Sequence, residues 1–467
     1  MKIKFWGAAH TVTGSSHLLL VDGARVLLDC GLFQGSRKIA RQINSEFVIP
    51  PAGINEMILS HAHIDHSGNI PGLVKAGFRG PIYCTPATQD LTRVLLRDSG
   101  HIQESDANFL NRKKSRNHEP PVEPLYTMDD AERAIPLLRP RSYDEPFTVA
   151  NGRLSAVFRD VGHILGSAFV EMTAAENGQT RKIIFSGDIG PPHKTILKDP
   201  EVPAEADVLI MESTYGNRCH AAEEDVEIKL ADCVNRVVAR GGKIIIPAFS
   251  VERTQEVVYA LNKLWNAGKL QRIPVYVDSP LAVNVTEIFR HHPECFDQEI
   301  NQSLIDDPDP FGFEGLIYVR DVMTSKRINM LRSPCIVISG SGMCEAGRVL
   351  HHLANNIEDP RSAVFFVGFQ AENTLGRKLV DGLKEVKILG DPYQVKAEIV
   401  IFNSFSGHAD AEGLRAFAGN VAQSGRLKKI FLVHGEETAM AALKETLGAD
   451  LPNCEVIMPA RGEEFEI

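Results

Sequence analysis

The stretch that decides the fold is His61-Ala62-His63-Ile64-Asp65-His66, which directly follows an apolar segment with the pattern of a β-strand. Its four possible metal ligands fall into two pairs. His61 and His63 can face one way from an extended turn, whereas Asp65 and His66 follow where a helix is expected to begin and can face a second point. One ion takes three or four nitrogen or oxygen ligands, so this hexapeptide can start two adjacent metal sites. The alternative is a solvated histidine-rich turn, but burying such a cluster without metal would leave several polar groups unpaired.

Further candidate ligands follow other strand-like segments of the chain, and they are His163, Asp188 and His434. The carboxylate of Asp188 could bridge two cations, which a neutral imidazole does not ordinarily do. Taken alone, each of the three is more typical of a loop or core residue, and the hexapeptide is what favours the metal interpretation. Asp29 could orient a metal-bound imidazole through a hydrogen bond, or it could cap the turn before Gly31.

Two adjacent cations are a common device for hydrolysing phosphoesters, because they generate a hydroxide nucleophile and stabilise charge on the phosphoryl oxygens. Such a reaction also needs a proton for the leaving oxygen. His408, in Ser406-Gly407-His408, is the candidate general acid, and Glu212 is the candidate carboxylate that holds and charges its imidazole. The structural alternatives, a helix-capping loop around His408 and a turn at Glu212, stay open at this point.

The composition is that of a globular protein: 43% of the 467 residues are hydrophobic and 24% are charged. This excludes a disordered, collagen-like or small disulfide-framework chain, and the length predicts two to three domains. The net charge of −10 argues against tight non-specific binding of nucleic acid, although a basic groove can still exist locally.

We expect a cytoplasmic protein that does not associate with membranes. No apolar run approaches the roughly 18–20 residues that span a bilayer, and the first residues are typical of an opening strand rather than a signal peptide. The eight cysteines are scattered, without a Cys-x-x-Cys pair, and are expected to be buried small hydrophobic residues.

The candidate ligands lie before residue 217 and after residue 398, and a strand–loop–helix pattern typical of a parallel α/β unit lies between them. We therefore expect a catalytic domain made of residues 1–216 and 399–467, interrupted by an inserted domain over residues 217–398.

At this point the motifs resemble a known family. The hexapeptide, with Asp29, His163 and Asp188, resembles the signature of the metallo-β-lactamase fold. Glu212, His408 and His434 resemble the three additional motifs of its β-CASP branch of nucleic-acid nucleases, which includes the mRNA 3′-end endonuclease and bacterial and archaeal RNases. The resemblance covers nearly the whole chain. It implies an α/β protein, with an αββα sandwich and an inserted α/β β-CASP domain.

The resemblance also implies two Zn²⁺ ions per chain. One would be held by His61, His63, His163 and Asp188, and the other by Asp65, His66, His434 and the shared Asp188. The implied catalytic residues are His408, Glu212, Asp65 and Asp29. The implied function is a zinc-dependent ribonuclease that hydrolyses phosphodiester bonds of single-stranded RNA in a cleft between two domains, with metal-bound hydroxide as the nucleophile. A histidine at position 434 resembles the RNA-directed members, and a homodimer is among the expected partners.

The inserted unit carries candidate phosphate-binding residues, because several of its loops precede helices, whose backbone N–H groups attract anions. The arginines could add bidentate contacts to phosphate. These candidates are Ser250, Arg253, Ser341, Gly342, Arg348 and Arg377. The alternative for each loop is an ordinary strand-to-helix turn.

Two other functions compete with the ribonuclease. One is a hydrolase of a small ester or phosphodiester on the same fold, and the other is a non-catalytic RNA-binding scaffold. The tandem histidines His291-His292 and His351-His352 are expected to be surface or helix residues rather than ligands.

Overall fold

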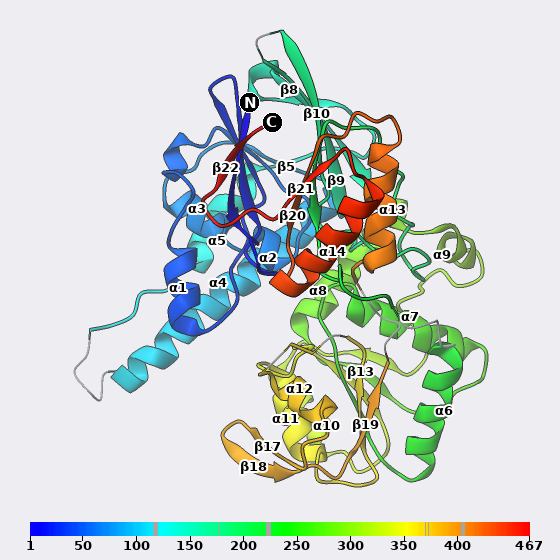
Figure 1. Ribbon diagram of the computed structural model, residues 1–467. Helices are drawn as coiled ribbons and strands as arrows, with labels where there is room; N and C mark the ends of the chain where they lie inside the picture. Colours follow the sequence, from blue (N-terminus) through cyan, green and yellow to red (C-terminus); the bar gives the residue numbers. More distant parts are fainter. Residues whose placement is uncertain (115–119, 177, 221–225, 369, 372, 403–406) are drawn as a thin grey trace. The chain divides into compact units, whose positions relative to one another are not determined.

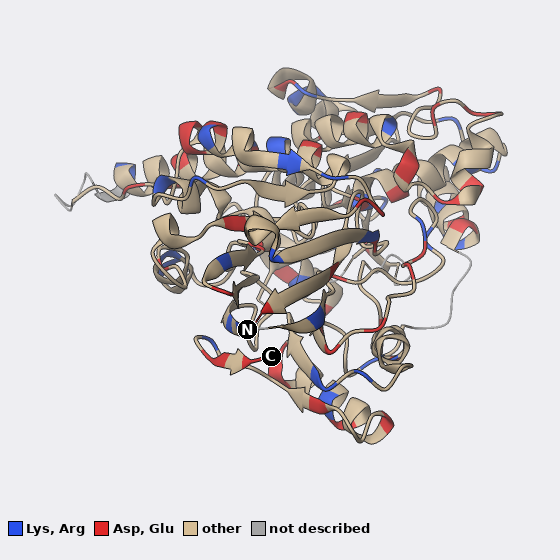
Figure 2. Ribbon diagram, turned by 90° about the horizontal axis from the view of Figure 1, so that it is seen from above, with Lys and Arg blue, Asp and Glu red and all other residues tan. Residues whose placement is uncertain are grey.

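The computed structural model describes residues 1–114, 120–176, 178–220, 226–368, 370–371, 373–402 and 407–467 (Figure 1). It divides into two compact units, one made of Met1–Cys219 with Gly407–Ile467 and the other of His220–Ser406. Acidic and basic residues are interspersed along the helices and strands (Figure 2).

The first unit contains two seven-stranded sheets. The first sheet has the order β22 (Glu464–Glu466), β1 (Lys2–Gly7), β2 (Ser16–Val21), β3 (Ala24–Leu28), β4 (Glu56–Ile58), β5 (Ile82–Cys84) and β6 (Leu138–Pro140). The second has the order β21 (Glu455–Ile457), β20 (Lys429–Val433), β11 (Val208–Glu212), β10 (Gln179–Phe185), β9 (Ala168–Glu176), β8 (Leu154–Asp160) and β7 (Phe147–Val149). Strand β8 alternates buried with more exposed residues, whereas β11, a parallel strand between two others, is buried throughout.

The two sheets pack face to face, because one apolar cluster takes side chains from both. Phe5 and Leu28 of the first sheet belong to the same buried cluster as Phe158, Phe185 and Phe431 of the second. A second cluster joins the outer face of the first sheet to α3 (Ile70–Lys75) and α5 (Met128–Ala134), and a third joins the second sheet to α13 (Ala411–Ala422) and α14 (Glu437–Asp450). The order of layers is therefore helix, sheet, sheet, helix, which confirms the predicted αββα sandwich (Figure 1).

The other helices of the first unit are α1 (Arg37–Asn44), α2 (Ile64–Ser67) and α4 (Pro86–Lys114), with short 3-10 turns at Pro51–Gly53, Ile135–Leu137 and Ala150–Gly152. Two helices begin with a side-chain cap. Thr127 and Asp130 form a reciprocal capping box at α5, and Asp410 accepts from Gly413 N at α13. The Asp410 cap places the start of α13 shortly after His408.

The second unit is built on a six-stranded parallel sheet, as predicted for the inserted domain. Its order is β14 (Leu316–Tyr318), β13 (Val275–Val277), β15 (Ile336–Ser339), β12 (Ile244–Pro247), β16 (Ala363–Phe366) and β19 (Glu398–Ile401). The remaining elements are α6 (Val226–Ala239), α7 (Arg253–Asn266), α8 (Pro280–His291), α9 (Gln298–Ser303), α10 (Val322–Met330), α11 (Arg348–Asn356), α12 (Leu375–Val380), a 3-10 turn at Pro293–Cys295 and the β17 (Glu385–Ile388)–β18 (Asp391–Gln394) hairpin.

One expected boundary differs from the structure. The sequence predicts that the inserted domain ends at residue 398, because a histidine-bearing loop follows the next strand. That strand is β19, and it pairs in parallel with β16 at the edge of the second unit's sheet. The second unit therefore continues to Ser406.

None of the helices in the described part of the chain is long and apolar enough to cross a membrane. Most cysteines are buried, as predicted, but Cys219 is exposed and Cys454 is partly exposed.

Candidate active site

The candidate ligands collect where strands of both sheets of the first unit end. Asp29 follows β3, the hexapeptide follows β4, and the second sheet supplies the rest from the ends of β8, β10, β11 and β20, namely His163, Asp188, Glu212 and His434. Within the hexapeptide, α2 begins at Ile64 with His63 as its N-cap. His61 and His63 thus lie in extended chain, while Asp65 and His66 lie on the helix. This change of backbone conformation lets one short segment serve two groups of ligands.

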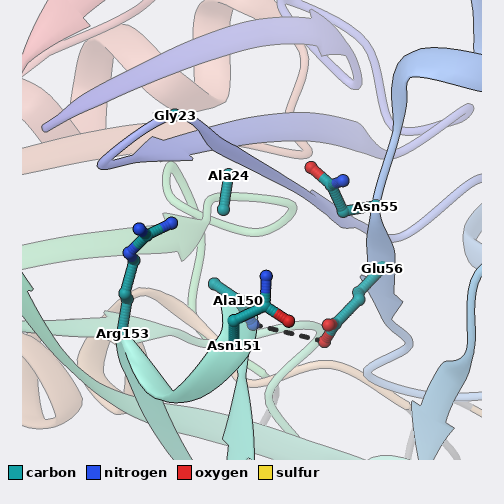
Figure 3. Close-up of a pocket in the computed structure, with 7 residues that line it drawn as sticks. All are labelled: Gly23, Ala24, Asn55, Glu56, Ala150, Asn151 and Arg153. Atoms are coloured by element: carbon teal, nitrogen blue, oxygen red, sulfur yellow. Dashed lines mark hydrogen bonds between the residues drawn. The ribbon is translucent and has the colours of Figure 1, made fainter.

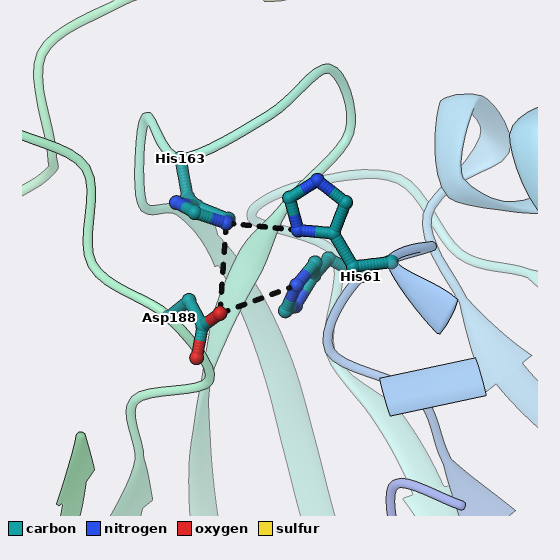
Figure 4. A group of neighbouring side chains, drawn as sticks. His61, His163 and Asp188 are labelled. Carbon is teal, nitrogen blue, oxygen red and sulfur yellow. Dashed lines mark hydrogen bonds and ion pairs between the residues drawn. The ribbon is translucent and has the colours of Figure 1, made fainter. Parts of the chain in front are cut away.

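The first group consists of His61, His63, His163 and Asp188, whose ligand atoms all lie within 4.8 Å of one another. Oδ2 of Asp188 lies 3.6 Å from His61 Nε2 and 3.5 Å from His163 Nε2. His163 Nε2 is also 3.1 Å from His63 Nδ1. Figure 4 shows the imidazoles of His61 and His163 directed toward the Asp188 carboxylate.

The second group consists of Asp65, His66 and His434, and Asp188 faces it as well. Oδ1 of Asp188 lies 3.2 Å from His66 Nε2 and 3.4 Å from His434 Nδ1. His434 Nε2 lies 3.5 Å from Asp65 Oδ2. The two oxygens of Asp188 therefore face different ligand groups, which is the arrangement that a bridging carboxylate needs.

Hydrogen bonds to Nδ1 fix the orientation of the histidine rings. His66 Nδ1 donates to Asp29 Oδ2 at 2.7 Å, and His163 Nδ1 donates to the carbonyl of Gly407 at 2.7 Å. The Ser60 hydroxyl donates to Asp29, so it accepts from His61 Nδ1 at 3.1 Å. The Thr214 hydroxyl donates to a carbonyl, so it accepts from His434 Nδ1 at 3.1 Å. In each case Nδ1 is engaged, so Nε2 is the nitrogen that is suited to bind a metal.

The structure offers a direct test of whether metal ions fit here. Among the described residues, four ligand atoms are buried without a hydrogen-bond partner, and they are Nε2 of His61, His66 and His434 and Oδ1 of Asp188. Such buried unpaired atoms are costly unless something binds them. Their nitrogen and carboxylate chemistry suits Zn²⁺ and related ions, so the residues present fit two cations.

The electrostatics keep the three imidazoles of the first group neutral and the Asp188 carboxylate charged. Burial lowers the pKa of His61 and His163 well below the usual value and lowers that of His63 to about 4, so all three are neutral at pH 7. Burial would raise the pKa of Asp188, but His434 and His66 beside it lower the pKa well below its usual range. Burial would likewise lower the pKa of His66, but Asp188 and Asp29 raise it well above 6.5, a preference for positive charge that a cation would satisfy.

Beside the ligand groups, His408 is paired with Glu212. Nδ1 of His408 lies 3.2 and 3.0 Å from the two oxygens of Glu212 and 3.9 Å from Asp188 Oδ2. Glu212 is fully buried and also accepts from the backbone N–H of Ile189. Burial would lower the pKa of His408, but Glu212 outweighs burial and raises the pKa to about 10. A protonated imidazole next to two ligand groups has the properties of a general acid. Ser406 of this motif lies outside the described residues.

The predicted phosphate-binding residues lie at the carboxyl ends of β12 and β15 and on the helices that follow in the second unit. The Ser250 hydroxyl is 3.3 Å from that of Ser279, the Ser341 hydroxyl accepts from Glu345 N, and Gly342 packs against the ring of Phe249. The three arginines form ion pairs with carboxylates of the same unit. Their partners are Glu256 for Arg253, Asp278 for Arg348 and Asp381 for Arg377. Phosphate binding by these residues stays a prediction.

The tandem histidines differ partly from expectation. His352 lies on α11 but is buried, and its Nε2 is 2.6 Å from Asp278 Oδ2 while its Nδ1 is 2.8 Å from Asn329 Oδ1. His292 is also buried, and it pairs with Glu294 at 2.7 Å. Both are tied to carboxylates of the second unit, and neither belongs to a metal-binding group among the described residues.

Sequence reasoning missed the residues that orient the ligands, above all Ser60, Thr214 and Lys194. Ser60 immediately precedes His61, and Thr214 closely follows Glu212, so their positions beside motif residues were a usable signal. Lys194 had no such signal. Its buried ammonium donates to the carbonyl of His163 at 2.5 Å, a contact that only the folded loop reveals.

A separate pocket lies at the other end of the strands (Figure 3). It is lined at the amino end of β4 by Asn55 and Glu56, and before β8 by Asn151 and Arg153, whereas the metal ligands follow the carboxyl ends. Burial raises the pKa of Glu56, and its carboxylate accepts from Ala150 N at 3.3 Å. No ligand of either group lines this pocket.

Comparison with known families finds three matches along the chain. Residues 11–218 match the metallo-β-lactamase superfamily, residues 254–379 match the Beta-Casp domain, and residues 392–459 match the Zn-dependent metallo-hydrolase RNA specificity domain. The RNA specificity match spans β19, His408 and His434, and therefore includes both a strand of the second unit and two residues of the candidate site.

Curated relatives are similar over almost the whole chain. A ribonuclease of Thermus thermophilus is 36% identical over 447 residues, covering 96% of each protein. The transcription termination factor FttA of Methanosarcina mazei is 30% identical over 96% of this chain and 69% of its own length. An RNase J-like protein of Methanocaldococcus jannaschii is 29% identical over 98% of both chains.

A solved structure from Enterococcus faecalis V583, of a protein of unknown function, shares the fold. It has a TM-score of 0.57 and 14% sequence identity, and the match covers 100% of this chain and 99% of that one. That structure shows the fold alone, and the family is established by the matches to the three family domains and by the curated relatives. The chain belongs to the metallo-β-lactamase superfamily, in its β-CASP branch of metal-dependent RNA hydrolases.

Proposed function

We propose that the chain is a zinc-dependent ribonuclease that hydrolyses phosphodiester bonds of single-stranded RNA. The observation that carries the proposal is the division of the Asp188 carboxylate between two ligand groups, with the His408–Glu212 pair 3.9 Å away. The match to an RNA specificity domain and the similarity to a ribonuclease support RNA as the substrate.

The proposal includes two zinc ions per chain. His61, His63, His163 and Asp188 would hold one, and Asp65, His66, His434 and Asp188 would hold the other. When bound, the ions would lower the pKa of water and stabilise negative charge on the phosphoryl oxygens.

The chain's own residues supply orientation and the proton. Asp29, Ser60 and Thr214 hold three of the imidazoles through Nδ1, so that Nε2 faces inward. Glu212 binds Nδ1 of His408 and keeps the imidazole protonated, so that His408 can donate the Nε2 proton to the leaving oxygen of the ribose. Without that proton the oxygen would leave as an alkoxide, which is a poor leaving group.

We include the loops of the second unit in the proposal as binding sites for the RNA backbone. Ser250 and Ser341 offer hydroxyl groups after the ends of parallel strands. We include Gly342 because it directly follows Ser341, although the ring of Phe249 takes the space beside it. Arg377, whose side chain is 41% exposed and paired only at the surface with Asp381, can exchange that partner for a phosphate. Arg253 and Arg348 support the same loops through their ion pairs with Glu256 and Asp278.

The test is cleavage of one single-stranded RNA, labelled in separate reactions at each end, by zinc-loaded wild type and by Asp65→Ala. We expect wild type to cut and the variant to lose cutting. Asp450→Ala is the matched control, because it removes an aspartate from an exposed ion pair with Arg415 and should cut like wild type. The product ladder separates internal from terminal attack.

Absence of cutting by zinc-loaded wild type would overturn the proposal. A turnover screen with small esters and phosphodiesters would then test the small-substrate hydrolase. Binding of RNA by a chain that cuts neither RNA nor small esters would indicate the scaffold.

A further inference from the structure

Tyr215 and Arg218 form a short stack beside His408. The ring of Tyr215 meets the imidazole of His408 edge to face, with centroids 5.8 Å apart and an interplanar angle of 78°. The guanidinium carbon of Arg218 lies 3.9 Å from the centroid of the Tyr215 ring, and Arg218 is exposed. A line of contacts thus runs from the candidate general acid to a basic group at the surface.

The backbone holds this stack in a fixed position. Tyr215 forms an isolated parallel bridge with Asp410, and Ala411 N donates to the carbonyl of Arg218 at 3.0 Å. Arg218 N donates in turn to the carbonyl of Tyr215 at 3.2 Å. Because Asp410 also caps α13, the turn that carries Arg218 is tied to the segment that carries His408. Both belong to the first unit, so the stack does not depend on the second.

A guanidinium held over an aromatic ring is well placed to bind phosphate. The group carries five N–H donors in its plane, and a ring beneath it restricts the rotation that would otherwise be lost on binding. Arginine pairs with phosphate through two parallel hydrogen bonds, and this geometry requires the plane to be held. Lysine in the same place would keep the charge but lose both the stack and the paired donors.

Arg218 is connected to His408 through the Tyr215 ring. A general acid stands on the side of the leaving oxygen, and on this ground we assign the phosphate that Arg218 binds to the leaving part of the RNA. We propose that Arg218, positioned by Tyr215, binds the phosphate next to the scissile one on the leaving side of the RNA. The inference rests on the proposed ribonuclease function and adds a binding residue to that same site.

The test removes the charge either from the RNA phosphate or from Arg218. One RNA carries a neutral methylphosphonate next to the scissile phosphate on the leaving side, which is the side whose product ends in a hydroxyl group. A second carries it on the other side. In wild type, neutralising the leaving-side phosphate should lower kcat/KM about tenfold, the size of one charge-assisted contact. In Arg218→Gln the unmodified RNA should already show that loss, and the methylphosphonate should add little, because both changes remove one contact.

Salt dependence gives an independent readout. Loss of one phosphate contact should reduce the slope of log affinity against log salt by about 0.7 for a single strand. Arg153→Gln is the matched control. It also removes one positive charge from a partly exposed side chain, but at the opposite end of the strands. It should change neither the slope nor the response to methylphosphonate.

Tyr215 is tested as a positioning residue. Tyr215→Phe keeps the ring and should retain the coupling between Arg218 and the leaving-side phosphate. Tyr215→Leu removes the stack and should lose it. Arg218→Lys should lose most of the coupling although its charge is kept. Zinc content and thermal unfolding establish that each variant is folded.

Two different failures are distinguishable. If zinc-loaded wild type cuts none of the RNAs, the ribonuclease proposal fails. If wild type cuts but the leaving-side methylphosphonate has equal effects in wild type and in Arg218→Gln, Arg218 does not contact that phosphate and this inference is overturned.

Discussion

Glu212 and His408 are 196 positions apart in the sequence, yet both carboxylate oxygens of Glu212 lie within 3.2 Å of His408 Nδ1. Glu212 ends a central strand of the second sheet, and His408 enters from the segment that follows the inserted unit. The insertion therefore separates in sequence two residues that the sandwich brings together, and the pairing favours the charged form of the candidate general acid.

Replacing Glu212 with glutamine should shift the pH dependence of cleavage. In the proposed mechanism the acid form of His408 is needed, so we expect activity to fall as the pH rises through its pKa, which Glu212 raises to about 10. Without the carboxylate that pKa falls, and the alkaline limb of the kcat profile should move to lower pH. The measurement is kcat across pH 6 to 10 (roughly the range in which imidazole and its raised form titrate). An unchanged alkaline limb would show that His408 is not the group responsible.

His408→Ala should lower kcat by about 10²–10⁴-fold, the usual contribution of general acid catalysis. Its zinc content should equal that of wild type, because Nδ1 of His408 is already bound by Glu212, although both residues lie within reach of Asp188 and His434. Substrates with a better leaving group, such as a nitrophenyl phosphodiester, should be much less affected. An equal loss on both substrates would assign His408 another role.

Asp29→Asn should weaken zinc binding by about 10–100-fold, since partners that orient metal ligands typically contribute that much. The Asp29 carboxylate accepts from His66 Nδ1 at 2.7 Å and from Ser60 N at 2.8 Å, and so supports ligands of both groups. Competition with a chromophoric chelator measures the affinity. Asp22→Asn, in the exposed turn before β3, is the control and should match wild type.

The second unit should depend on Asp278 for stability. Asp278 is fully buried and accepts from His352, Ser325 and Arg348, each at 2.6 Å. Asp278→Ala should cost about 3–5 kcal/mol of unfolding free energy, because it leaves buried partners unpaired. Trp265 is the single tryptophan of this unit, so its fluorescence in a Trp6→Phe background reports denaturant unfolding there.

The Asp278 carboxylate also predicts how the free energy of unfolding of the second unit changes with pH. Burial would raise the pKa of Asp278, but its hydrogen bonds lower it below 3.8. Its contribution to stability is therefore complete above the unfolded pKa of about 3.9 and is lost as the pH falls through the lower folded value. The difference in unfolding free energy between wild type and Asp278→Ala should be constant near pH 7 and shrink at strongly acid pH. A constant difference down to pH 2 (about two units below the usual carboxyl value) would contradict the assignment.

Much of the candidate site could be predicted from the sequence because its candidate ligands follow strands. The hexapeptide combines four ligand side chains with a change from extended chain to helix, and such a cluster is costly to bury unless metal binds it. The isolated residues His163, Asp188 and His434 were harder, since each is ordinary without its neighbours in space. The αββα layers came from the family resemblance rather than from periodicity.

What the sequence could not give were contacts that exist only after folding. β19 has the pattern of a strand leading to a histidine loop, and only pairing with β16 assigns it to the second unit. His352 resembles a surface histidine until Asp278 is placed beside it. The arginines of the second unit were expected to bind phosphate. The sequence does not show that Arg253 and Arg348 form ion pairs with carboxylates of the same unit. The expected homodimer and cytoplasmic location stay predictions.

The central claim is that two zinc ions, sharing Asp188, are needed to cut RNA. The most direct measurement is the cleavage rate of single-stranded RNA by metal-stripped protein as zinc is added back in known equivalents per chain. We predict little cutting up to the first equivalent, a rise toward the second and a plateau there, with Asp65→Ala inactive throughout. A plateau at one equivalent, or cleavage that does not depend on zinc, would contradict the claim.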